Sequence, residues 1–383
     1  MCADTASSRR LRVWATTARS VNGLGCRAFL FLAVAHTLCP LLTAQALPLR
    51  LRETLTTHLK ASERQLKTVE GGGIVAYSVD TGAADEVMLV GISRIWATPE
   101  AFVRGYTNIT KFESAPGVIA GSKFSVPPRE SDLTGLSFSK KEVDELKSCK
   151  PGDCSFKIGD AGLRFLKNTV NWNSPDYVEQ ATKALRLLWF QYLTRYQLTG
   201  NEGLATYHDS AEQFSVEQGL IELLAKTSAL QEYAPQLSEY LRQYPKSEDK
   251  ATEEFFYWQV GEFGLKPVHR ITHVVIQRTP ASWGEAYVIA SKMLFASHYF
   301  RSALEIRCLI PGQDQHIGGM HYLITVQRSQ VDGMTGLRGR FLRGVAVRRA
   351  RQAMERYIAS AKENVERDFN LTRQPGPQVA PLR

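Results

Sequence analysis

The hydrophobic period of this chain changes twice, and those changes restrict the folds that it can adopt. Residues 74–79 and 87–96 are rich in β-branched and apolar side chains and flank the turn-forming segment 80–82, which predicts two strands. Residues 130–250 instead repeat apolar side chains every three to four positions, as helices do. From Phe255 onward the shorter period returns. We therefore expect strands at both ends of the chain and a helical block between them.

The strands of the second half are followed by a long helix. Apolar and β-branched runs predict strands at 271–276, 286–295, 299–310 and 320–327. Because residues 287–310 contain neither Gly nor Pro, this stretch is either two adjoining strands or one long bent strand with a bulge. After Gly344, a helix of about six turns carries these apolar side chains on one face: Val347, Ala350, Met354, Tyr357, Ile358, Ala361 and Val365.

Capping residues mark the other helices. Residues 48–70 predict one leading helix that ends at the glycines 71–73. The segment 98–100, Thr-Pro-Glu, supplies an N-cap, a first-turn proline and an acidic residue, so a helix directly follows the strand at 87–96. The helical block predicts a helix that starts near Ser139, one from 174–176 to Gly200, and two more at 216–230 and 235–244.

The N-terminus predicts export. Residues 1–27 carry five Arg against one Asp, residues 28–43 have no formal charge, and Ala44-Gln45-Ala46 places small residues at alternate positions. This pattern is typical of a secretory signal peptide, here 1–46. An uncleaved N-terminal membrane anchor is the alternative, which Pro40 within the apolar stretch disfavours. We therefore expect a periplasmic or secreted protein.

Three cysteines follow the predicted cleavage site. In an oxidising compartment, Cys149 and Cys154 predict a disulfide that closes a Pro-Gly turn. Zinc binding is the competing interpretation, but no second Cys/His pair has suitable spacing. Cys308 lies in an apolar run and is expected to be a buried small hydrophobic residue.

The order of elements resembles the START-like, or helix-grip, superfamily. The resemblance covers roughly 74–120 and 255–369, and the segment VGISRIWATPEAFVRGYTNITKFESAPGV is similar to the opening strand and first helix of that superfamily. It implies an α+β fold in which a curved antiparallel sheet grips a long C-terminal helix, often with an apolar ligand between them. The chain departs from the pattern by inserting a helical block, which could cover the cavity mouth, fill it or form a separate domain.

The expected organisation has five parts. A signal peptide at 1–46 precedes 47–125, which holds the leading helix and the first part of the START-like domain. The inserted helical block spans 126–254, and the remaining strands and C-terminal helix span 255–370. Residues 371–383, with three prolines, are expected to form a disordered tail.

The common catalytic and metal motifs are absent. The chain has no G-x-S-x-G, G-x-x-x-x-G-K-[ST] or H-E-x-x-H, and no G-x-G-x-x-G that follows a strand. His269 and His273 could share one face of a strand, but four residues of strand span about 13 Å, too far for one ion. We expect neither a metal nor a cofactor.

Polar side chains that interrupt apolar strands are the candidates for ligand contacts. Lys292 or Arg328 could hold a carboxylate or phosphate, and His298 could be a general base. The alternative is that these are edge residues facing water, or that Arg328 pairs locally with Asp332. The candidate ligand-binding residues within the expected cavity are Lys292, His298, Tyr299, Tyr322, Arg328, Met354 and Tyr357.

The resemblance implies an exported, non-catalytic protein that binds a lipid or another apolar small molecule between the sheet and the last helix. The alternatives are a cyclase or hydrolase that uses His298 or Tyr299, and a protein-interaction module built on the helical block. Export makes nucleic acid a poor partner. A run of six Arg without an acidic residue indicates contact with an anionic membrane surface or a solvated helix face: Arg338, Arg340, Arg343, Arg348, Arg349 and Arg351.

Overall fold

The computed structural model describes residues 46–112, 117–246, 251, 253–262, 266–281, 284–312, 319–334 and 336–373. Nearly all of the predicted signal peptide and most of the predicted disordered tail lie outside these residues, and the described part of that tail, 371–373, is helical. None of the helices within the described ranges combines the length and the apolar character needed to cross a membrane.

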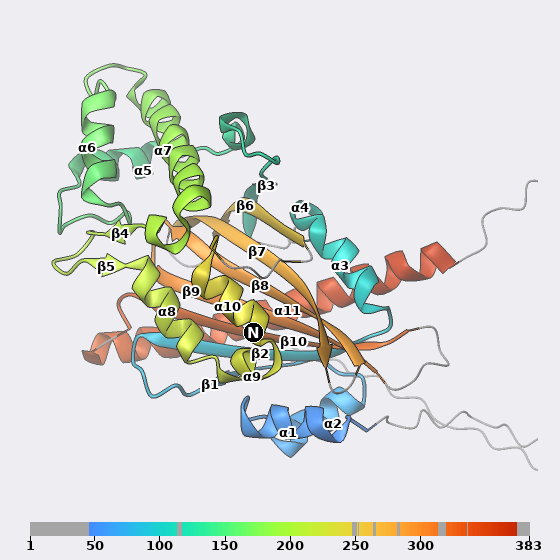
Figure 1. Ribbon diagram of the computed structural model, residues 1–383. Helices are drawn as coiled ribbons and strands as arrows, with labels where there is room; N and C mark the ends of the chain where they lie inside the picture. The colour runs from blue at the N-terminus through green and yellow to red at the C-terminus, as the bar shows by residue number, and fades with distance from the viewer. Residues whose placement is uncertain are drawn as a thin grey trace, which may run out of the picture. The chain divides into compact units, whose positions relative to one another are not determined.

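Eight of the described strands form one curved, open, antiparallel sheet (Figure 1). Their bounds are β1 (Val75–Val79), β2 (Glu86–Ile95), β3 (Val118–Lys123), β6 (Glu253–Glu262), β7 (Pro267–Ala281), β8 (Gly284–Ala296), β9 (Phe300–Pro311) and β10 (His321–Val331). The spatial order is β1-β2-β10-β9-β8-β7-β6-β3. The early strand β2 therefore lies beside the last strand β10, which confirms that both ends of the chain build the sheet.

The register fixes which residues meet across the centre of the sheet. Val90 of β2 lies opposite Val326 of β10, which in turn lies opposite Ile306 of β9. The run 287–310 forms two strands, because the chain reverses at Tyr299, whose φ is +62°. Since β8 and β9 then pair directly, the first of the two alternatives for this run is correct.

One face of the sheet is covered by α3 (Pro99–Thr107), α4 (Ile109–Phe112) and α11 (Gly336–Arg373). The expected Thr98 cap is present, because its side chain accepts from the amide of Ala101. Helix α11 crosses β2, where Met354 and Ile358 pack on the sheet (Figure 1). The predicted α+β class, with a curved sheet holding the C-terminal helix, is confirmed, although α11 begins earlier than expected.

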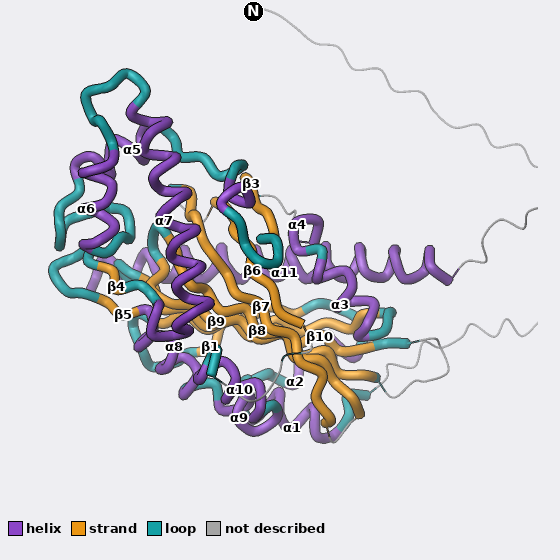
Figure 2. The backbone as a smooth tube through the Cα atoms, turned by 45° about the horizontal axis from the view of Figure 1, so that its top comes forward, coloured by secondary structure: helices purple, strands orange, loops and turns teal. Residues whose placement is uncertain are grey.

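The other face carries the helical block and the leading segment (Figure 2). The helices are α1 (Leu49–Thr57), α2 (Glu63–Glu70), α5 (Lys140–Ser148), α6 (Asp160–Thr169), α7 (Tyr177–Thr199), α8 (Val216–Ala225), α9 (Ser228–Tyr233) and α10 (Pro235–Gln243), with a small hairpin of β4 (Thr206–Tyr207) and β5 (Phe214–Ser215). Side chains of α7, α8 and α10 share one apolar core with the sheet. The block therefore covers a face of the sheet and is no separate domain.

Two segments that were each predicted to form one helix form two helices in the structure. The leading helix is two helices, because Lys60 has a φ of +56° and Ser62 starts α2 with a reciprocal capping box to Gln65. The helix expected at 216–230 is split into α8 and α9. Helix α6 and strand β3 were not expected from the sequence.

The disulfide is confirmed. Cys149 and Cys154 are bonded, and Lys150 and Asp153 pair between them as a tight antiparallel bridge. Such a bond is compatible with an exported protein.

Helix α11 packs tightly against the sheet at Gly91, and this contact gives a first prediction. A Cβ added there would be 2.3 Å from Cδ1 of Ile358 and 3.0 Å from Sδ of Met354. We expect Gly91→Ala to lower the free energy of unfolding by about 1–3 kcal/mol through overpacking, as measured by urea denaturation. Gly344 lies within α11 and has open space at its Cβ position. Gly344→Ala should therefore raise the free energy of unfolding by about 0.5–1 kcal/mol. Equal effects of the two substitutions would contradict this packing.

Candidate functional site

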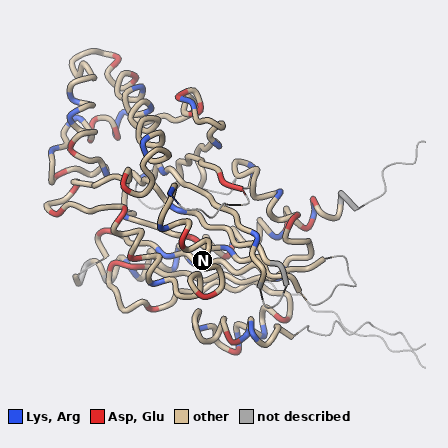
Figure 3. Tube along the Cα trace, viewed as in Figure 1, with Lys and Arg blue, Asp and Glu red and all other residues tan. Residues whose placement is uncertain are grey.

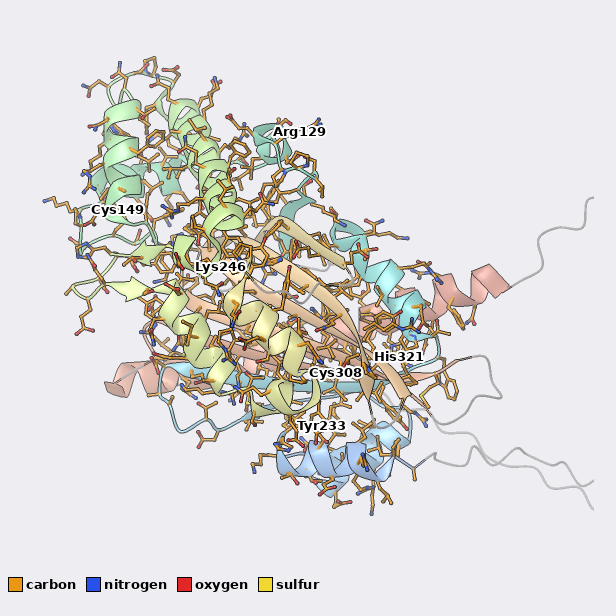
Figure 4. All side chains as sticks on the ribbon, viewed as in Figure 1. Arg129, Cys149, Tyr233, Lys246, Cys308 and His321 are labelled. Carbon is orange, nitrogen blue, oxygen red and sulfur yellow. A yellow bond between two sulfur atoms is a disulfide. The ribbon has the colours of Figure 1, made fainter. Side chains whose placement is uncertain are left out.

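An apolar cleft lies between the helix-block face of the sheet and helices α1 and α9. Its free volume is about 120 Å³. Figure 4 places Cys308 on the sheet and Tyr233 at the end of α9, and both line the cleft. Most of the lining side chains are apolar and come from the sheet and the two helices. The polar and charged ones are Thr54, His58, Lys226, Thr227, Ser228, Tyr233, Thr279 and Arg328.

The floor of the cleft comes from alternate residues of neighbouring strands. In a strand, residues two apart point to the same face, so Ile306, Cys308 and Ile310 of β9 form one row. Ile324 and Val326 of β10 lie opposite Cys308 and Ile306 and form the next row. The β-branched residues that build these central strands thus provide a continuous apolar surface.

The walls come from two helices that a hydrogen bond ties together. Leu51 and Leu55 of α1 are four residues apart and therefore share one helix face, which lines the cleft. On α9, Leu230 faces the same space. The side chains of Thr54 and Tyr233 are hydrogen-bonded at 3.1 Å. This bond holds α1 against α9 across the cleft.

One end of the cleft is cationic. Glu86 is 1% exposed, and its carboxylate accepts from Nζ of Lys226 at 2.8 Å and from Nη1 of Arg328 at 2.6 Å. Arg328 lies two residues beyond Val326 on β10, so the register places it at the end of the apolar rows. Two cations share one carboxylate, which leaves a net positive charge where the side chain of Lys226, 44% exposed, reaches solvent.

Cys308 is a free thiol on the cleft floor. Burial raises its pKa to about 12, so the sulfur is a protonated thiol at neutral pH. Cys308 is partly exposed, so the full burial expected from the sequence is not observed, but the protonated sulfur still contributes an apolar, unreactive surface to the cleft.

The seven predicted ligand residues do not form one site. Arg328 lines the cleft. Tyr322 lies on the same face of the sheet but belongs to the core beneath α1 and α2. Lys292 is on that face under α7 and α10, while Met354 and Tyr357 are on α11, across the sheet.

Lys292 is fully buried in a polar cluster. Its Nζ donates to Oδ1 of Asn201 at 2.8 Å and lies 4.8 Å from the ring centre of Tyr196 and 5.2 Å from that of Tyr244. Burial lowers the pKa of Lys292 to about 7, although the carboxylate of Glu254 opposes this shift. The cluster joins strand β8 to the helical block.

The cluster continues through a neutral histidine. Burial lowers the pKa of His273 to about 4. Because a carboxylate can only accept, Nε2–H of His273 donates to Glu254 at 3.2 Å, which leaves Nδ1 to accept from the hydroxyl of Tyr196 at 3.0 Å. His269 lies elsewhere, against the carbonyl of Ser137. Within the described ranges, no group of three or more His, Cys, Asp and Glu could hold a metal ion.

His298 and Tyr299 support the turn between β8 and β9. Nδ1–H of His298 donates to the carbonyl of Ser155 at 2.6 Å, next to the disulfide. Burial lowers the pKa of His298, which keeps the ring neutral. The hydroxyl of Tyr299 accepts from the amide of Lys266 at 2.9 Å. Both side chains therefore fasten loops to the turn.

The space beside Tyr357 is filled by the protein itself. Arg307 is buried between the sheet and α11, and it donates to the hydroxyls of Tyr106 at 2.8 Å and Tyr357 at 2.9 Å. The hydroxyls of Tyr106 and Ser291 are hydrogen-bonded at 3.0 Å. Together with the contact at Gly91, these bonds make the interface between α11 and the sheet closely packed.

Comparison with protein-family models found no match, and comparison with curated proteins found none either.

The buried amine gives a prediction on the pH dependence of stability. Between pH 7 and 9 the unfolded chain keeps the proton of Lys292, whose ordinary pKa is 10.5, whereas the folded chain releases it. Stability therefore rises with pH over this window. We expect Lys292→Met to flatten this rise in urea denaturation at pH 6 to 9, whereas Lys183→Met, at an exposed position, should retain it. An unchanged slope in the Lys292 variant would mean that the buried amine stays charged.

Proposed function

We propose that this protein binds a small amphiphile, with a short apolar chain or ring in the cleft between α1, α9 and the sheet, and an anionic head group at Lys226 and Arg328. The observation that carries the proposal is an apolar cleft with a net cationic end. The proposed role is binding without a catalytic step.

The size and lining of the cleft support an apolar occupant. Apolar cavities of roughly this size stay dry and bind small molecules such as benzene, because water finds no polar partners there. The rows around Cys308 and Ile324 offer such a surface. A free volume of about 120 Å³ fits a short chain or a single ring.

The charges support an anionic head group. Arg328 and Lys226 both direct nitrogen atoms at Glu86, whose single carboxylate neutralises one of them. A carboxylate or phosphate at this end would supply the second negative charge through charge-assisted hydrogen bonds. Such a ligand would have its apolar part along the floor toward Ile324.

The proposal moves the ligand from the place that the START-like resemblance implies. We retain that superfamily as the proposed relationship, since the sheet and α11 have its arrangement. The close packing at Gly91 and the bonds of Arg307 favour the opposite face for the ligand. The disulfide is compatible with export, and we propose a periplasmic or secreted protein on the basis of the N-terminal pattern.

Filling the cleft tests its occupancy. We expect Val326→Phe to lower the affinity for the small apolar probe indole at least tenfold, measured by isothermal titration calorimetry, because the larger ring takes up free volume. Val326 is partly exposed, so the sheet tolerates the change. Mass spectrometry of a solvent extract of the wild type should also show a bound apolar molecule.

Val87→Phe is the matched control, because Val87 is likewise partly exposed but contacts the core on the α11 side of the sheet. It should leave indole binding unchanged. Loss of binding in the Val87 variant alone would place the ligand beneath α11, and an absence of binding by the wild type would overturn the proposal.

Selectivity for an anionic head group is a separate prediction. The wild type should bind octanoate more tightly than 1-octanol in the same calorimetric titration. Lys226→Gln should lower the octanoate affinity about tenfold, since one charge-assisted hydrogen bond is lost, and leave the 1-octanol affinity unchanged. The partly exposed position of Lys226 limits any effect on folding. Equal losses for both compounds would show that the amine contributes only to packing.

A further inference from the structure

The first half of α11 has an exposed face that is both apolar and basic. Phe341 is 76% exposed and Leu342 is 54% exposed. At 3.6 residues per turn, these two residues fall with Val345, Arg348 and Arg349 within about 120° of the helix circumference. Val345 is partly buried, and both arginines are exposed. Apolar and cationic side chains therefore share one side of the helix.

The charge of this segment has one sign. Between Asp332 and Glu355 the sequence contains six Arg and no acidic residue. Elsewhere in residues 46–373, no more than three basic residues lie between successive acidic residues, and Figure 3 shows the two kinds of charge interspersed. Figure 1 shows the N-terminal turns of α11 extending past the end of β2. The segment thus projects from the sheet with its positive charge uncompensated by acidic residues of its own.

The inward side of the same turns is anchored. Arg343 points to the protein and donates to the backbone carbonyls of Ala83 and Glu86, the latter at 2.8 Å. Further along, Val347, Ala350 and Met354 belong to the core beneath the helix. Because these contacts fix the rotation of α11, the face with Phe341 and Arg348 must point outward.

We propose that this face docks on the surface of an anionic lipid bilayer. Phe341 and Leu342 would enter the boundary between head groups and acyl chains, and Arg348 and Arg349 would contact lipid phosphates. Arg351 lies about 60° beyond this arc and would reach the phosphates with its long side chain. Helices that combine basic and large apolar side chains on one surface bind membranes in this way. The proposal is independent of the cleft, because its residues lie on α11, and the cleft lies on the opposite face of the sheet.

Vesicle sedimentation tests the electrostatic part. The full chain should bind vesicles of phosphatidylcholine with 30 mol% phosphatidylglycerol, bind phosphatidylcholine vesicles far more weakly, and lose binding as NaCl rises from 0.1 to 0.5 M. Changing Arg348, Arg349 and Arg351 to Gln should reduce partitioning about fivefold per Arg, or on the order of 100-fold in all.

A control variant distinguishes binding through this face of α11 from a general effect of the protein's net charge. Arg164→Gln, Lys167→Gln and Lys183→Gln remove the same charge from exposed positions of α6 and α7 and should change partitioning by less than twofold. Equal losses in the two triple variants would overturn a defined face. The cleft variant Val326→Phe should bind vesicles as the wild type does, so failure of one proposal is distinguishable from failure of the other.

Insertion of Phe341 and Leu342 into the bilayer is tested by a separate measurement. In Phe341→Trp, the fluorescence should shift to the blue on vesicle binding and be quenched by brominated lipids, because the ring enters the bilayer boundary. Phe341→Ser with Leu342→Ser should weaken binding at least tenfold. An unquenched Trp, dimerisation through this face in light scattering without vesicle binding, or binding to duplex DNA in place of vesicles would each overturn the proposal.

Discussion

The pairing of β2 with β10 is the constraint on which the rest of the structure depends. It brings residues from the two ends of the chain into one sheet, so that β2 is covered on both faces. Gly91 of β2 allows α11 to lie directly on one face, while Met88 of the same strand lines the cleft on the other. Without this pairing, neither α11 nor α1 would have a sheet surface to bury against.

Covering both faces requires the helices to satisfy polar groups that the strands bury. Arg307 on β9 finds the hydroxyls of Tyr106 and Tyr357 on the α11 side. Lys292 on β8 finds Asn201 of the helical block on the other side. Glu305, on the same strand as Arg307, pairs with its charge. A buried polar group without hydrogen-bond partners would be costly, so each bond to a helix favours one position of the helix layer over others. The apolar contacts alone are less selective.

Because helices cover both faces of the sheet, some features of the fold could be predicted from the sequence and others could not. The alternation that would assign side chains to a face is hidden when both faces are apolar, as in the buried residues 286–296. Most strands of the sheet, the capped helix and the long last helix were predictable from the sequence, although β3 and β6 were not. The side of the sheet to which Lys292, Tyr322 and Arg328 point was not predictable. The helix break at Ser62 did have a signal, the Ser-x-x-Gln capping box.

The cleft residues that were not predicted from the sequence as ligand contacts have weaker sequence signals. The spacing of Leu51 and Leu55 predicted a buried helix face but could not show which surface buries it. Glu86 and Lys226 are 140 residues apart, and no local pattern connects them. Their meeting depends on how the helical block packs on the sheet, which is a property of the folded chain.

Glu86 links the two proposed sites. Its carboxylate holds the cations at the end of the cleft, and its backbone carbonyl accepts from Arg343, which fixes the outward face of α11. The carboxylate and the carbonyl of one residue are only a few ångströms apart, so the head-group end of the cleft and the anchored start of α11 lie at the same edge of the sheet. An amphiphile that leaves the cleft head group first would therefore emerge beside the helix that we propose to contact the bilayer.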